Sequence, residues 1–129
     1  MKERRFTPLE ATRTLPLVKR IARDILDNGR KAREIVSKLG DNAYEDDEFC
    51  RLTNRLHDLF RELEEIGCSF KDWNFEIGLV DFPARIDGQE VLLCWRSDEE
   101  EIRHFHGYED GYAGRREIPA KYFKVPTTA

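Results

Sequence analysis

Two histidines lie two residues apart in the last third of the chain, at His104 and His106. On an extended strand such residues point to the same face, about 6.5–7 Å apart, so two imidazoles can bind one divalent ion. A third ligand would come from Asp81, from Cys94 or from the acidic pair at 109–110. We hypothesise a zinc, manganese or iron site of His104, His106 and Asp81. The alternative is that His104 is a surface residue and His106 a partly buried, hydrogen-bonded one.

Cys94 is a candidate nucleophile, with His104 or His106 as its general base. The positive charge of Arg96 or of a protonated imidazole would favour its thiolate. Cys94 lies within an apolar stretch, however, and a small packed thiol is the common outcome there. Both roles therefore stay open for Cys94 at this point.

A glycine-containing loop, 111–114, precedes Arg115 and predicts a site for a small anionic ligand. Backbone N–H groups of such a loop and a guanidinium can bind phosphate or carboxylate, and in an enzyme Arg115 would stabilise negative charge. The sequence contains neither a nucleotide-binding phosphate loop nor a dinucleotide-binding motif. The alternative is an ion pair between Arg115 and Asp81, Glu109 or Asp110 that holds the loop in place.

A β-hairpin is expected to position Asp81 and Cys94. Asp87-Gly88 is a strong two-residue turn signal, and it separates two strands at 79–86 and 89–96. A two-residue turn pairs Ile86 with Gln89 and, counting back, Asp81 with Cys94. The sequence therefore predicts that the two side chains are neighbours on one face.

A third strand, 102–106, should extend this hairpin into an antiparallel meander. Alternation along the strand puts Phe105 with Trp95 on the apolar face, and His104 and His106 on the opposite face. That second face would carry all the candidate ligands.

Helices are expected before the sheet. Thr7 to Glu10 form a capping box with proline at the first helical position, which predicts a helix from about residue 8. Pro16 should end or kink this helix near Leu15, and a longer helix should run from Pro16 to a stop at Gly40.

The next helix carries a leucine-rich heptad pattern and ends at Gly67. Phe60 and Leu26 lie beside the main apolar stripes, so two helices of one chain do not cover every apolar side chain. We therefore expect a homodimer with a four-helix arrangement, the alternative being that the sheet covers these residues. The heptad positions are Phe49, Leu52, Leu56, Leu59, Leu63 and Ile66.

With 129 residues, the chain is expected to form a single α+β domain, residues 1–129. We expect a helical hairpin over about 7–67, packed on an antiparallel β-meander of three to four strands over about 75–125. A net charge of −4 with interspersed signs argues against nucleic-acid binding. The sequence contains no apolar run of membrane-spanning length, and its three cysteines lack metal or disulfide spacing, so the expected location is cytoplasmic.

Several segments resemble one prokaryotic family. They are 78–85, the turn at 87–88, 91–96, 105–106 and 111–115. Together they are similar to the family catalogued as domain of unknown function 2203, in which a tryptophan usually stands at the position of Phe105. The resemblance implies the domain boundaries and an intracellular setting, and it implies no activity, cofactor or partner.

Two functions follow from these features. The heptad helix favours a non-catalytic, cytosolic binding or scaffolding protein that self-associates through its helices. The convergence of five polar residues on one face favours a metal-dependent, hydrolase-like enzyme instead; they are Asp81, Cys94, Arg96, His104 and His106.

Overall fold

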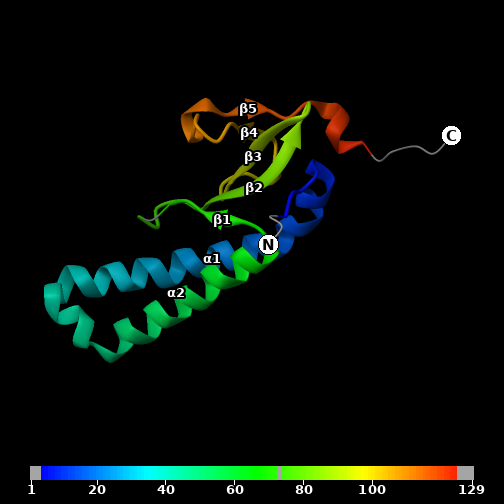
Figure 1. The fold of residues 1–129 in the computed structure, drawn as a ribbon. Coiled ribbons are helices and arrows are strands. Elements are labelled where there is room, and N and C mark those ends of the chain that lie inside the picture. Colours follow the sequence, from blue (N-terminus) through cyan, green and yellow to red (C-terminus); the bar gives the residue numbers. More distant parts are fainter. Residues whose placement is uncertain (1–3, 73, 125–129) are drawn as a thin grey trace.

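The computed structural model describes residues 4–72 and 74–124. Two long antiparallel helices come first and a five-stranded antiparallel sheet follows (Figure 1), which confirms the α+β class. Helix α1 spans Pro8–Leu39 and α2 spans Asp47–Ile66, joined by a 3-10 helix at Gly40–Glu45. The strands are adjacent in chain order: β1 Ser69–Phe70, β2 Leu79–Ile86, β3 Gln89–Arg96, β4 His104–His106 and β5 Arg116–Glu117.

Helix α1 is continuous through Pro16, so the predicted end of a first helix near Leu15 is wrong. Its start is as expected: the Thr7 hydroxyl accepts from the Glu10 N–H, and the Glu10 carboxylate accepts from the Thr7 N–H, each at 3.1 Å. Pro16 is exposed, so its ring lies on the solvent side of the helix, while Leu15 and Val18 continue the buried stripe. Burial of that stripe stabilises the helix against the lost hydrogen bond.

Helix α2 packs against α1 through its heptad leucines, and Gly67 ends it in the left-handed conformation at φ 107°. Leu52, Leu56, Leu59 and Leu63 are all buried within the single chain. Of the two side chains that suggested a second copy, Leu26 is covered within the single chain and Phe60 is partly covered. Leu26 is buried, and the Phe60 ring lies 6.0 Å from the Phe70 ring of β1.

The central hairpin has the predicted register throughout, including the pairs Ile86 with Gln89 and Asp81 with Cys94. One face of the sheet packs on α1, and its largest fully buried side chains are Trp95 and Phe82.

The edges of the sheet differ from the expectation. The sheet begins at residue 69 instead of about 75, and the two-residue strands β1 and β5 bring the total to five. Strand β4 covers only 104–106 of the expected 102–106. Strands as short as β1 and β5 carry too few residues for an alternating pattern to be recognised.

The described part of the chain contains no helix that is both long enough and apolar enough to cross a membrane.

Candidate metal site

Three potential metal ligands meet on the face of the sheet that points away from α1. Asp81 of β2, Cys94 of β3 and His106 of β4 are all buried, and their ligand atoms lie within 4.8 Å of one another. Within residues 4–72 and 74–124 they form the one such group of three. Asp81 and Cys94 are direct partners across the strands, and β4 lies on the other side of β3, so the hairpin register creates the site.

The position of His106 defines which of its nitrogens faces the group. Its Nδ1 lies 2.8 Å from the Gly107 carbonyl oxygen, and a carbonyl oxygen only accepts hydrogen bonds. Nδ1 therefore carries a proton, and in the neutral ring Nε2 has a free lone pair. Nε2 lies 3.4 Å from Oδ1 of Asp81. Two electron-rich atoms face each other there, an arrangement that is favourable only with a proton or a cation between them.

Burial determines the electrostatics of the group. Removal from water raises the pKa of the Asp81 carboxyl, an effect that the charges of His106 and Lys71 partly oppose. Burial, followed by the negative charge of Asp81, raises the pKa of the Cys94 thiol to about 12. Without a metal, Cys94 is therefore a neutral thiol at pH 7, which weakens the hypothesis of a free nucleophilic thiolate. A bound metal ion would reverse this, because a coordinated thiol loses its proton.

A pocket of about 270 Å³ opens onto the three ligands. Lys71 and Tyr108 line it together with Gly111, so the loop that follows β4 forms part of its wall. The pocket is large enough to admit water and a small molecule to the buried ligands.

His104 lies outside the Asp81, Cys94 and His106 group. Its Nδ1 lies 3.4 Å from Oε2 of Glu99, a residue of the turn between β3 and β4. The hypothesised set of His104, His106 and Asp81 is thus only partly brought together, and Cys94 stands where His104 was expected. His104 and Cys94 are cross-strand partners, but the imidazole of His104 lies outside the group that Asp81, Cys94 and His106 form.

Arg115 is held by the same glutamate. Its Nη2 donates to Oε1 of Glu99 at 2.6 Å and to the Cys94 carbonyl at 3.0 Å. An ion pair was one of the predicted roles, and Glu99, which was not among the predicted partners Asp81, Glu109 and Asp110, forms one. An anionic ligand at Arg115 would have to compete with this carboxylate.

Glu99 is the residue that sequence reasoning missed. Its Oε1 also accepts from the Arg96 backbone N–H at 2.8 Å, and its carbonyl accepts from Trp95 Nε1 at 2.9 Å. No spacing rule distinguishes Glu99 from the other acidic residues of the turn, because its role arises from the fold of the turn back over β3.

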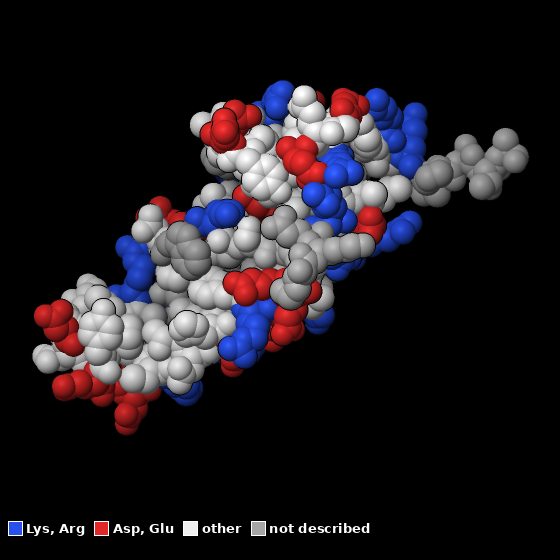
Figure 2. Space-filling view, viewed as in Figure 1, with Lys and Arg blue, Asp and Glu red and all other residues white. Residues whose placement is uncertain are grey.

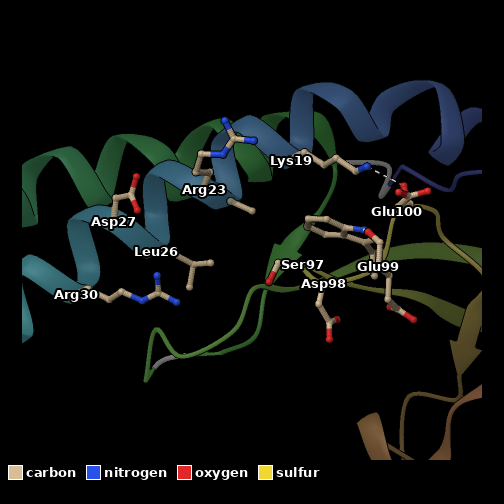
Figure 3. A pocket seen from close by; sticks show the side chains of 11 residues that line it. Lys19, Arg23, Leu26, Asp27, Arg30, Ser97, Asp98, Glu99 and Glu100 are labelled. Carbon is tan, nitrogen blue, oxygen red and sulfur yellow. Dashed lines mark hydrogen bonds between the residues drawn. The ribbon is translucent and has the colours of Figure 1, made fainter.

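A second pocket, of about 390 Å³, lies between α1 and the turn that contains Glu99 (Figure 3). Trp95 and Leu26 form its apolar part. Lys19 on α1 reaches across it and donates to the Glu100 carbonyl at 2.7 Å. Its described lining contains neither histidine nor cysteine, so it lacks the ligand types of the first pocket.

The three thiols are expected to differ in reactivity. In the native, metal-free protein at pH 8, we expect only the exposed Cys50 to react promptly with a disulfide reagent. Cys94 and Cys68 are buried, and burial raises the pKa of both thiols to about 12. Absorbance of the released reagent should show one fast-reacting thiol per chain in the native protein and three reacting thiols per chain in denaturant. A fast second equivalent that disappears in Cys94→Ser would show that Cys94 is accessible.

The fold and the buried site define an α+β protein with a sheet-borne aspartate, cysteine and histidine group beside a small pocket. The chain belongs to the family described as uncharacterized conserved protein (DUF2203), whose model matches residues 4–118. The matched region includes every residue of the site. Searches of curated proteins and of solved structures found no match.

Proposed function

We propose that the protein binds one divalent transition-metal ion through Asp81, Cys94 and His106 and uses it to activate water. The observation that carries the proposal is the 3.4 Å contact between Nε2 of His106 and the Asp81 carboxylate. Nitrogen and oxygen ligands lie about 2.0–2.1 Å from zinc, so two of them at a tetrahedral angle are about 3.4 Å apart. The two atoms therefore have the separation that a shared zinc ion requires.

Two further features support a metal ion at this position. The hydrogen bond from His106 Nδ1 to the Gly107 carbonyl is the arrangement that orients metal-binding histidines and makes Nε2 a better ligand. The Cys94 sulfur, a soft ligand, favours zinc or iron over manganese.

Three protein ligands leave the fourth position of a tetrahedral site for water, which is the pattern of catalytic zinc sites. A metal-bound water loses its proton near neutral pH and becomes a nucleophile. The pocket would hold a small substrate beside it, with Lys71 at the wall to attract an anionic group. A hydrolytic reaction is the chemistry that this arrangement supports best.

Metal analysis of His106→Ala tests the proposal. We expect wild-type protein, loaded with zinc and then dialysed, to retain close to one ion per chain. His106→Ala should bind zinc more than roughly 100-fold less tightly, since loss of a ligand exceeds the loss caused by removing an outer hydrogen-bond partner. Elemental analysis and competition with a fluorescent chelator measure both quantities.

His104→Ala is the matched control, because His104 lies on the same strand and face but contacts Glu99. It should retain the metal. Wild-type protein that binds no zinc, or a His106→Ala variant that binds it as tightly as wild type, would show that the group is purely structural.

Two other aspects of function are proposed on separate grounds. The three free thiols favour a cytoplasmic location, where the reducing environment keeps them available. Exposed apolar side chains at the end of the helical hairpin favour a second candidate role, that of a non-catalytic binding protein that self-associates.

A further inference from the structure

The helical hairpin extends beyond the sheet, so the end where α1 meets α2 lacks a covering layer (Figure 1). We call this end, residues 31–48, the hairpin tip. Val36, Leu39 and Tyr44 in the tip are 44%, 41% and 74% exposed. They make up most of the large apolar side chains that are exposed in the described part of the chain. Clustered exposed apolar groups mark interaction surfaces, whereas scattered ones do not.

The tip is itself well ordered by packing. Ala43 and Leu52 are buried beneath it, and the Tyr44 ring stands edge-on to the Phe49 ring at 5.7 Å. The exposed side chains therefore project from backbone that is held in place by packed residues. A surface of this kind can bind without first folding, which lowers the entropic cost of association.

Charge on the tip is divided between its two parts. The last turns of α1 carry three basic residues, Lys31, Arg33 and Lys38, and one acidic residue, Glu34, whereas every charged residue from 41 to 48 is acidic. Within the described residues, no ion pair joins these lysines to the acidic group. Figure 2 shows acidic residues at the far end of the hairpin and an uncharged surface between them and the sheet. The acidic residues are Asp41, Glu45, Asp46, Asp47 and Glu48.

We propose that the hairpin tip binds a second copy of this chain about a two-fold axis. A two-fold interface must be complementary to itself, since each residue pair occurs twice. The tip meets this requirement: antiparallel hairpins would place the acidic part of each over the basic turns of the other. Val36, Leu39 and Tyr44 would be covered at the centre, where apolar and aromatic side chains contribute most to binding.

This interface differs from the one that the heptad pattern suggests. The heptad leucines are occupied by packing between α1 and α2. The contact between two copies is therefore formed by Val36 and Leu39, which continue the apolar stripe of α1 beyond the sheet. Two such hairpins still form a four-helix arrangement, but the two copies touch only at their hairpin tips.

Sedimentation equilibrium of a matched pair of variants tests the proposal. Leu39→Glu places a charge in the proposed interface, whereas Leu17→Glu places the same charge on α1 at nearly the same exposure, 43%, away from the tip. Wild-type protein should sediment as a dimer of the 15.2 kDa chain at micromolar concentration. We expect Leu39→Glu to raise the dissociation constant at least tenfold and Leu17→Glu to leave it unchanged.

Charge reversal identifies the partner. A variant with Lys31→Glu and Lys38→Glu and another with Asp41→Lys and Asp47→Lys should each dimerise at least tenfold more weakly than wild type. An equimolar mixture of the two should form a heterodimer, which shows that the surfaces meet. Wild-type protein that stays monomeric up to about 100 μM, or equal effects of Leu39→Glu and Leu17→Glu, would overturn the proposal. All variants are first checked for native circular dichroism.

Discussion

Asp81→Asn is expected to make the metal-free protein more stable while abolishing metal binding. The carboxylate is buried, and the asparagine amide has nearly the same shape without the charge. We expect the free energy of unfolding in EDTA at pH 8 to rise by on the order of 1 kcal/mol. Zinc should raise the melting temperature of the wild type by mass action and leave that of Asp81→Asn unchanged. Thermal unfolding by circular dichroism measures both effects.

The stabilisation should depend on pH in a defined direction. Burial raises the pKa of Asp81 in the folded state above its unfolded value. Ionisation therefore favours the unfolded state, and the penalty grows as pH rises from the unfolded pKa through the folded pKa. The advantage of Asp81→Asn should be full above the folded pKa and vanish below the unfolded one.

Asp98→Asn is the control for the loss of an aspartate charge. Arg96 donates hydrogen bonds to the Asp98 carboxylate and lowers its pKa, so that carboxylate stabilises the fold when ionised. Asp98→Asn should therefore not stabilise the protein. If metal-free Asp81→Asn is less stable than the wild type, the Asp81 carboxylate stabilises the fold and is not kept there as a metal ligand.

Trp95→Ala is expected to cause the largest loss of stability, about 3–5 kcal/mol. Trp95 is among the largest fully buried side chains and packs between the sheet and α1, and its Nε1 donates to the Glu99 carbonyl. A loss of that size is a large part of the 5–15 kcal/mol that stabilises a typical domain. Urea unfolding followed by circular dichroism measures it.

Trp95→Phe separates packing from hydrogen bonding. Phenylalanine keeps most of the apolar contact but lacks the N–H, so we expect a loss of only about 1–2 kcal/mol. A loss in Trp95→Ala as small as that in Trp95→Phe would show that the indole does not fill the core as the structure indicates.

Local features of the sequence predicted much of the fold. The capping box at Thr7, the glycine at the end of α2 and the Asp87-Gly88 turn act over a few residues, and all three have the predicted effect. Because the turn defines the register, it also predicted that Asp81 and Cys94 face each other. The helix end predicted at Pro16 was wrong, since burial of the stripe on the opposite side of α1 outweighs one lost hydrogen bond.

The composition of the site was decided by tertiary structure. Alternation along β4 predicts only that His104 and His106 share a face. Which of them joins Asp81 and Cys94 depends on a turn that folds back and places Glu99 beside His104. That turn has no periodicity or motif, because its conformation arises from hydrogen bonds to Trp95, Arg96 and Arg115. The sequence by itself thus determined the central hairpin and its register, while long-range contacts completed the sheet edges and selected the three side chains that meet.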